Sequence, residues 1–293
     1  MPTDASFSAE PFETRCADGV RLAGRLLIPR EPIGAVQFNA GTGAKKSFYQ
    51  PFLEFLAEHG YVCCLWDYRG AGESAPPSLR GCGYTFREYG LQDMPAVKAY
   101  LQRRFPDLPL YLVCHSAGGQ QIGFMPDLSG IRGMVAFAVS AGYLPAMPLH
   151  YRLLSAYFFY VFAPVSIALT GYVAARRFGI MEDLPKQVAL EWRDWCSRPD
   201  YLFDPKFAGV TVPVQAYSQL PFPVHLYWTP DDTISNERNT RRFWSHAGSP
   251  HGIRMEEVRA AAYGVREMGH FGFFRKAQRE RLWPQVLEVL RGM

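Results

Sequence analysis

A serine stands at the tip of a run of small residues, Cys-His-Ser-Ala-Gly-Gly, at positions 114–119. The apolar residues 110–113 before it predict a strand, and the residues after it predict a helix. A strand, a tight turn and a helix form a nucleophile elbow, which holds a serine in a strained conformation with its hydroxyl exposed. Cys114 replaces the glycine that is usual there, and it is small enough to fit. We therefore predict that Ser116 is a catalytic nucleophile, with an ordinary strand-to-helix loop as the alternative.

An acid and a base follow this serine in the chain. Asp231 and Asp232 come directly after the apolar residues 224–228, which predict a strand. His270 lies late in the sequence, in the segment Gly-His-Phe-Gly, which is flexible enough to bring an imidazole back to the serine. We predict that His270 takes the serine proton and that Asp232 orients its ring, with Asp231 as the rival acid. His115, beside the nucleophile, is expected to be structural.

Strands and helices alternate along most of the chain. Residues 12–28 predict a hairpin, and short apolar strands are expected at 35–39, 61–66, 110–113, 134–139, 224–228 and near 254–258. Helices are expected at 48–58, 88–104, from 236 and at 277–290. This order predicts an α/β fold with a mostly parallel sheet of eight strands and helices on both faces. Residues 1–142 and 220–293 would form the core, and residues 143–219 a helical lid inserted after the sixth strand.

Within that insertion, residues 153–175 carry no charged side chain and are long enough to cross a membrane. A single span there would place Ser116 on the opposite side of the bilayer from Asp232 and His270. We therefore expect no stable span but an apolar lid, which leaves transient contact with a membrane surface open. Pro164 should divide this stretch into two shorter helices, because an interior proline costs a helix about 3 kcal/mol.

The composition excludes several classes of protein. The 293 residues carry a net charge of only +4, with scattered basic residues, which argues against nucleic-acid binding. The six cysteines form no C-x-x-C pair and the seven histidines show no ligand spacing, so we expect no metal and no cofactor. Free thiols and an N-terminus without a secretory signal favour the cytoplasm. The oligomeric state stays open.

Several of these segments resemble those of a known superfamily. Residues 67–74, Asp-Tyr-Arg-Gly-Ala-Gly-Glu-Ser, are similar to a segment of the α/β-hydrolases, and the order serine, aspartate, histidine is theirs as well. Residues 115–120, residues 183–185 with 191–196, and residues 269–275 further resemble a bacterial branch related to serine aminopeptidases and monoacylglycerol lipases. The resemblance covers essentially the whole chain. It implies the fold and the triad, and it gives no substrate.

The resemblance also bears on two residue assignments. In such families the acid is commonly followed two residues later by Ile or Val, so Ile234 favours Asp232. The oxyanion hole would use the amide of Ala117 and a second amide from the loop after residues 35–39. That loop begins His-Gly in relatives and Asn-Ala here; we choose Gly41 as the second donor, with Ala40 close behind.

Together these features predict a cofactor-independent serine hydrolase that forms an acyl-enzyme on Ser116. Its partner would be a small carboxylic ester or thioester with an apolar acyl or alkyl group, because the lid is uncharged and aromatic. Two alternatives remain open. One is an acyltransferase that uses the same triad, and the other is a non-catalytic binding protein that retains the fold.

Overall fold

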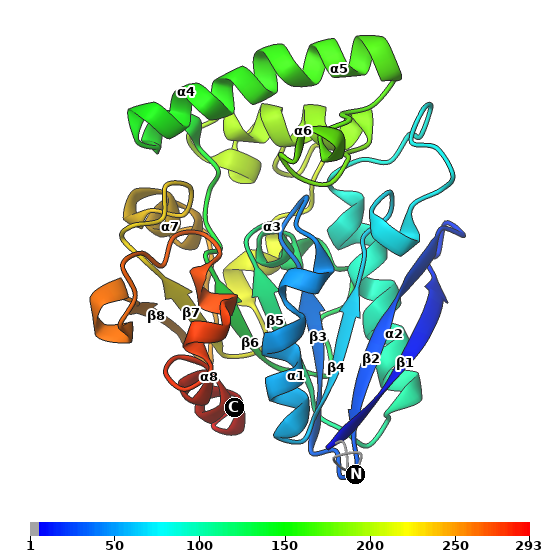
Figure 1. Cartoon of the computed structure of the whole chain (residues 1–293), viewed down its shortest axis with the longest axis vertical. Coiled ribbons are helices and arrows are strands. Elements are labelled where there is room, and N and C mark those ends of the chain that lie inside the picture. The colour runs from blue at the N-terminus through cyan, green and yellow to red at the C-terminus, as the bar shows by residue number, and fades with distance from the viewer. Residues whose placement is uncertain (1–5) are drawn as a thin grey trace.

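A single twisted sheet of eight strands forms the centre of the molecule (Figure 1). The computed structural model describes residues 6–293, so the first five residues of the N-terminal segment that we judged to lack a signal lie outside it. Along the sheet the strand order is β1-β2-β4-β3-β5-β6-β7-β8. The first pairs, β1 with β2 and β2 with β4, are antiparallel, and all the others are parallel. The mostly parallel eight-stranded sheet predicted from the sequence is confirmed.

The strands fall close to the apolar runs of the sequence. They are β1 (Phe7–Arg15), β2 (Arg21–Pro29), β3 (Gly34–Asn39), β4 (Tyr61–Trp66), β5 (Leu110–His115), β6 (Ile131–Phe137), β7 (Val224–Trp228) and β8 (Ile253–Glu257). Every residue of β3, β4, β5 and β7 is buried. Continuous burial is expected where helices cover both faces of a parallel sheet, and it explains why these strands show no alternation of polar and apolar residues.

Helices lie on both faces of the sheet and, in the insertion between β6 and β7, above it. They are α1 (Gln50–Glu58), α2 (Met94–Arg104), α3 (Ala117–Gln120), α4 (Leu149–Tyr157), α5 (Ala163–Thr170), α6 (Lys186–Cys196), α7 (Glu237–Trp244) and α8 (Trp283–Arg291). In Figure 1, α1 and α8 lie in front of the sheet and α2 lies behind it. The last helix was predicted to begin near residue 277 and begins at Trp283 instead. Pro284 has no backbone N–H and therefore fits in the first turn of a helix.

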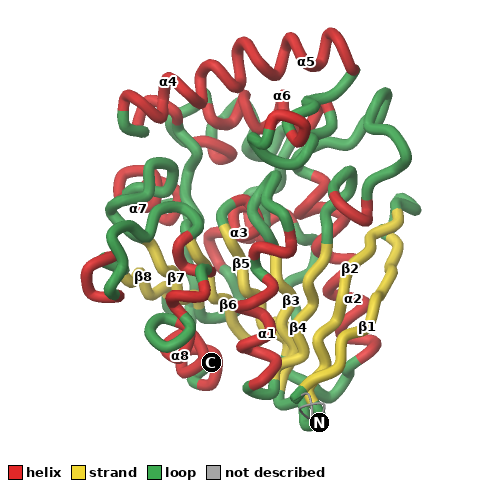
Figure 2. Tube along the Cα trace, in the orientation of Figure 1, coloured by secondary structure: helices red, strands yellow, loops and turns green. Residues whose placement is uncertain are grey.

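The chain between β6 and β7 carries α4, α5 and α6 above the sheet, as the tube in Figure 2 shows. The prediction that Pro164 divides this region into two helices is wrong, because Leu149–Thr170 is one continuous helix of 22 residues. A π turn, η6 (Phe158–Phe162), joins α4 to α5 just before this proline. The same arrangement precedes Pro95, where the π turn η3 (Tyr89–Asp93) leads into α2. In an ordinary α-helix a proline ring clashes with the carbonyl four residues earlier, and proline has no N–H to donate to that carbonyl. The wider π turn displaces this carbonyl and so relieves the clash.

By length and composition, this helix of 22 residues is also the one segment of residues 6–293 that could cross a membrane. Only 17% of its most apolar window is buried within the molecule. It lies across the top of the body, above α6, and the chain returns to the body from both of its ends (Figure 1).

Candidate active site

Ser116 occupies the turn between β5 and α3. Its backbone has φ 50° and ψ −122°, a conformation that costs a non-glycine residue about 1–3 kcal/mol. The turn leaves no room for a side chain two residues later, because a Cβ on Gly118 would lie 2.1 Å from the Asn39 carbonyl oxygen. Cys114 does fit, and its sulfur accepts a hydrogen bond of 3.6 Å from the Asn39 side-chain amide. The strand, turn and helix predicted from the sequence are therefore present, with Ser116 at the tip.

A chain of hydrogen bonds joins Ser116 to His270 and Asp232. Ser116 Oγ lies 3.0 Å from His270 Nε2, and His270 Nδ1 lies 2.7 Å from Asp232 Oδ2. The other carboxylate oxygen of Asp232 accepts the backbone amides of Ile234 at 2.7 Å and Ser235 at 2.9 Å. The Asp232 side chain is fully shielded from solvent, and that of His270 is 10% exposed. The structure thus brings the three residues together from three separate loops.

The partners of His270 decide where its proton resides. An ionised carboxylate only accepts hydrogen bonds, so the proton lies on Nδ1, which faces Asp232. The unprotonated Nε2 then accepts a hydrogen bond from the Ser116 hydroxyl. This tautomer is the one that a general base needs beside a serine nucleophile.

The rival acid, Asp231, holds the loop that carries the histidine. Its two oxygens accept the backbone amides of Met268 and Gly269, each at 2.9 Å. Asp231 therefore contacts the main chain just before His270 and makes no hydrogen bond to the imidazole, whose partner is Asp232. Asp232 therefore orients the imidazole ring, and Asp231 holds the backbone of the loop that carries it.

A cavity of about 450 Å³ lies beside the serine, between the sheet and the helices of the insertion. Ser116 and His270 lie in its wall, and among its described lining residues none is Asp, Glu, Lys or Arg. The insertion contributes the aromatic side chains Tyr151, Tyr157, Phe158, Phe159, Phe162 and Trp192. Trp195, also on α6, does not line the cavity and packs against Phe86 at a ring distance of 5.0 Å.

Comparisons with known proteins bear on the fold. The family model described as serine aminopeptidase, S33, matches residues 30–167, a span that contains Ser116. Among solved structures, an esterase of Pyrococcus furiosus matches with a TM-score of 0.63 and 16% identity, over 99% of this chain and 93% of that one. A thermostable carboxyl esterase of Bacillus coagulans matches with a TM-score of 0.58 and 15% identity, over 97% and 98% of the two chains. A search of curated proteins gave no match.

The chain has the α/β-hydrolase fold. At these levels of identity the two esterase structures show that the fold is shared, and a shared fold does not specify a substrate. The substrate has to be argued from the site itself.

Two backbone amides of this chain were predicted to bind an oxyanion. The amide of Ala117 begins α3, where the first N–H groups of a helix have no partner within the helix. The amide of Gly41 is engaged differently, because it donates to the Tyr49 hydroxyl over 3.2 Å. Gly41 nevertheless lies against the nucleophile, since a Cβ placed on it would be 3.4 Å from the Ser116 Cβ. Ala40 is buried beside it, and its carbonyl accepts the Tyr68 hydroxyl.

His115 links this oxyanion loop to the histidine loop. Its Nε2 faces the backbone carbonyl of His270 at 2.9 Å and must donate, so its Nδ1 is bare and accepts the Tyr49 hydroxyl at 2.8 Å. Burial holds the pKa of His115 well below its usual range and keeps the ring neutral. The expectation that His115 is structural agrees with these contacts. Tyr49 was missed, because no sequence motif marks it.

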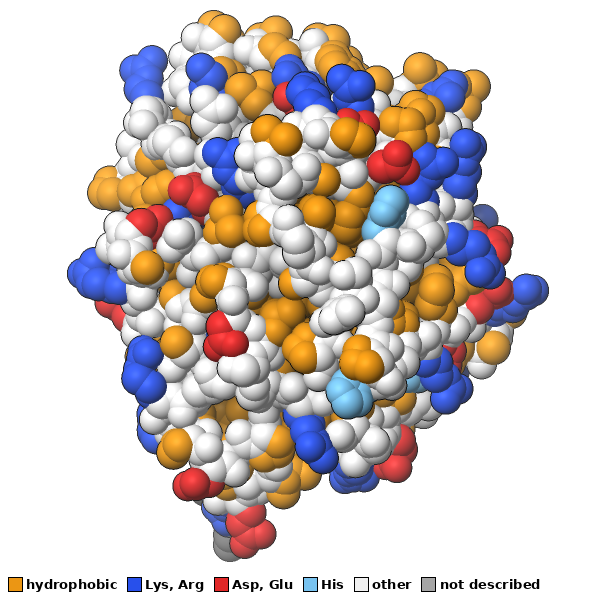
Figure 3. Space-filling view, turned by 180° about the vertical axis from the view of Figure 1, so that it is seen from behind, with side chains coloured by type: hydrophobic (Ala, Val, Ile, Leu, Met, Phe, Trp, Pro, Cys, Tyr) orange, Lys and Arg blue, Asp and Glu red, His pale blue; other side chains and the backbone are white. Residues whose placement is uncertain are grey.

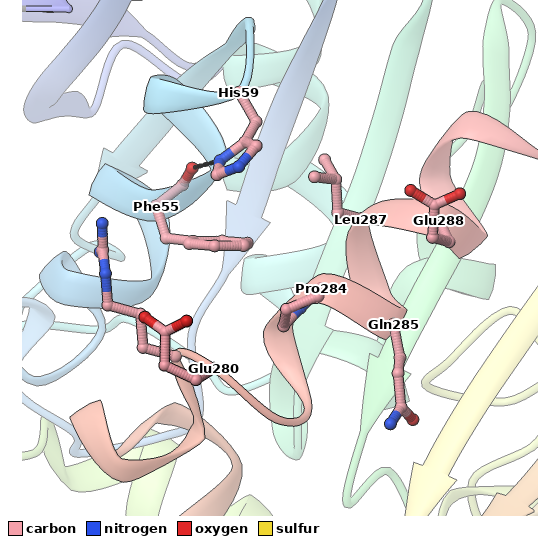
Figure 4. Close-up of a pocket in the computed structure, with 8 residues that line it drawn as sticks. Phe55, His59, Glu280, Pro284, Gln285, Leu287 and Glu288 are labelled. Carbon is pink, nitrogen blue, oxygen red and sulfur yellow. Dashed lines mark hydrogen bonds between the residues drawn. The ribbon is translucent and has the colours of Figure 1, made fainter.

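A second hollow of the molecule lies between α1 and α8, far from the elbow in sequence (Figure 4). His59 is at its edge, and its Nδ1 is already bonded to the Phe55 carbonyl at 2.7 Å. The described residues that line it include neither a serine nor a cysteine. Over residues 6–293 no cluster of His, Cys, Asp and Glu is suited to hold a metal ion. The cavity beside Ser116 is thus the candidate active site.

Proposed function

We propose that this α/β-hydrolase is a serine hydrolase that cleaves a carboxylic ester or thioester with an apolar acyl or alkyl group. The observation that carries the proposal is the hydrogen-bonded chain from Ser116 through His270 to Asp232, which opens into an apolar cavity. A cavity of this size and lining is typical of sites that bury most of a small apolar ligand. Its described lining residues include no Asp, Glu, Lys or Arg that would pair with a charged substrate.

The reaction would proceed through two acyl transfers. As Ser116 Oγ attacks the carbonyl carbon, its proton moves to His270 Nε2, and the carbonyl oxygen becomes an oxyanion. Collapse of this intermediate breaks the bond to the alcohol or thiol, which leaves with the proton from His270. A water molecule then attacks the acyl-enzyme while His270 accepts its proton, and the acid is released as Ser116 regains its hydrogen.

The oxyanion would bind to the amides of Ala117 and Gly41. Loss of one such donor typically costs about 3–4 kcal/mol of transition-state stabilisation. The Gly41 amide would have to leave the Tyr49 hydroxyl, and an anionic oxygen is a stronger acceptor than a phenol. Ala117 is thus the donor that is ready in the resting protein, and Gly41 the donor that the substrate recruits.

The segment 143–219 would act as a lid that shields the acyl-enzyme and selects the acyl group. Its aromatic side chains form the cavity wall opposite Ser116, which supports this role. An enclosed apolar wall would also suit an acyltransferase, in which an alcohol or amine takes the place of water. The complete hydrogen-bond chain at Ser116 favours an enzyme over a binding protein that only retains the fold.

A fluorophosphonate probe tests the nucleophile directly. We expect the probe to label the wild-type chain at Ser116 and to leave Ser116→Ala unlabelled. Ser155→Ala is the matched control, because Ser155 lines the same cavity and makes no hydrogen bond to His270. Retention of the label in Ser116→Ala would overturn the proposal. Turnover of an ester and a thioester with the same acyl chain, with and without an added alcohol, then distinguishes ester hydrolysis, thioester hydrolysis and acyl transfer to the alcohol.

We also propose a reducing compartment, the cytoplasm, for this hydrolase. All six cysteines are free thiols and five of them are buried. Burial raises the pKa of Cys63 and Cys114 well above the usual range, so these thiols are poor nucleophiles. Fractionation of cells that express the chain tests the compartment, and recovery outside the cytoplasm would contradict it.

A further inference from the structure

The continuous helix Leu149–Thr170 carries a row of exposed apolar side chains on its outer face. The row recurs at every fourth residue and consists of Leu149, Leu153, Tyr157, Val161, Val165 and Leu169. We call these six residues the outer ridge. Each is between 47% and 68% exposed, which is unusual for so many large apolar side chains in line.

The π turn in the middle of this helix keeps the outer ridge on one side. An α-helix advances about 100° per residue, so a row of every fourth residue drifts by about 40° at each step. Over the length of the ridge the drift would be about 200°, which would carry the row around the helix. The wider turn η6 takes up one extra residue and reduces that drift roughly by half. The exposed row therefore stays within an arc of about 100° along its whole length.

The outer ridge borders the mouth of the catalytic cavity. Tyr157 of the ridge and its neighbour Leu154 are both more than half exposed and also line the cavity. On other segments, Ile180 (52% exposed) and Phe271 (37% exposed) also line the cavity. The cavity thus opens between apolar side chains that also belong to the surface, and an apolar substrate reaches Ser116 across them.

Residues 149–186 have an excess of basic side chains, with Arg152, Arg176, Arg177 and Lys186 against Glu182 and Asp183. Residues 149–170 contain Arg152 and no acidic residue. The exposed Arg176 and Arg177 follow the helix, next to an exposed Phe178. Glu182 approaches Arg176 only at 4.0 Å. Seen from behind in Figure 3, hydrophobic side chains gather along the top edge of the molecule with basic side chains beside them. Such a surface is complementary to anionic headgroups above an apolar layer.

We propose that the outer ridge docks on the surface of an anionic phospholipid bilayer, with the helix lying in the plane of the interface and the cavity mouth turned toward the lipid. The buried inner residues Phe159, Ala163 and Ser166 fasten the helix to the body, so it lies on the bilayer and does not cross it. A second copy of the chain seated on the ridge would cover the cavity mouth, which argues for lipid as the occupant. The docking itself is independent of catalysis; the delivery of substrate from the bilayer rests on the proposed function.

Vesicle co-sedimentation of the full chain tests the docking. We expect binding to vesicles of phosphatidylcholine with phosphatidylglycerol, weaker binding to phosphatidylcholine alone, and a loss on raising the salt concentration. Val165→Glu and Leu169→Glu should each weaken binding at least tenfold, because a carboxylate does not enter the acyl region. Neither side chain lines the cavity. Ile33→Glu is the matched control, because Ile33 is 52% exposed before the amino end of β3, away from the helix.

Two further measurements keep the docking and the proposed function apart. Turnover of a short soluble ester by Val165→Glu should equal that of the wild type, which shows that the variant is folded. Ser116→Ala should bind vesicles as the wild type does, so a failed nucleophile assignment would leave the docking intact. Equal vesicle binding by Val165→Glu and the wild type, or none by either, would overturn the docking. A dimer that Val165→Glu dissociates, without vesicle binding, would overturn it in favour of self-association.

Discussion

The elbow end of the sheet and the helix above it are built by opposite means. At the elbow, Asp232 accepts three hydrogen bonds, and Tyr49 joins Gly41 to His115. Along the helix Leu149–Thr170, the described side-chain hydrogen bonds gather at the C-terminal end, where Ser166 and Thr170 hold the Tyr172 carbonyl. Directional bonds fix atoms to a fraction of an ångström, whereas apolar contacts tolerate changes of shape. Changes at the elbow should therefore alter the rate, and changes in the helix should alter the choice of substrate.

The largest effect is expected at the aspartate pair. Asp232→Asn should lower kcat on a simple ester by about three to four orders of magnitude, because an amide in that position stabilises the wrong tautomer of His270. Asp231→Asn should cost about tenfold, since one amide oxygen can still accept from the Met268 or Gly269 backbone. Steady-state kinetics with circular dichroism of both variants make the comparison. A larger loss at Asp231 in a folded protein would reverse the assignment.

A smaller effect is expected at Tyr49, on stability more than on the rate. Tyr49→Phe leaves the buried Gly41 amide and His115 Nδ1 without partners, and each such loss costs about 1–3 kcal/mol. We expect a lower free energy of unfolding by urea and a kcat that falls by far less than in Ser116→Ala. Phe48→Leu, at the neighbouring and partly buried ring, is a control that removes no hydrogen bond. An unchanged free energy of unfolding in Tyr49→Phe would show that this link contributes nothing.

Local patterns predicted the fold well, whereas the tertiary contacts of Asp231 and Tyr49 were missed. The buried strands β4 and β7 were predicted to the residue, because a short continuous apolar run is typical of a strand buried on both faces. The prediction of two helices around Pro164 was wrong, because it assumed the free-energy cost of a proline inside an ordinary α-helix. The π turn before Pro164 relieves that cost. The role of Asp231 depends on a backbone 38 residues away, which no local pattern encodes.

The aromatic wall should control the choice of acyl group. Phe158→Ala and Phe162→Ala each enlarge the cavity beside Ser116 and should shift the preferred acyl length upward, with a change of several-fold in kcat/KM for long esters. The shortest ester should be affected least, because it does not reach these rings. A series of esters measured on both variants gives the profile. Tyr160→Ala is the control, because Tyr160 lies on the same helix, is 53% exposed and does not line the cavity. An unchanged profile would remove the proposed lid from substrate selection.

The smallest effect should come from the titration of His115, which is confined to the elbow. The folded protein disfavours its charged form, so its pKa lies below the value near 6.5 of an unfolded chain. Below that pH the unfolded chain binds the extra proton, so this contribution to stability is complete above about pH 6.5 and declines as the pH falls. One proton corresponds to at most about 1.4 kcal/mol per pH unit.

The groups that face the ring are Tyr49 and His270, and His115→Gln leaves both in place. Urea unfolding between pH 5 and 7 should therefore show a shallower pH dependence in His115→Gln than in the wild type. Equal slopes would mean that His115 is protonated as readily in the folded protein as in the unfolded chain, and its assignment as a neutral link between the two loops would fail.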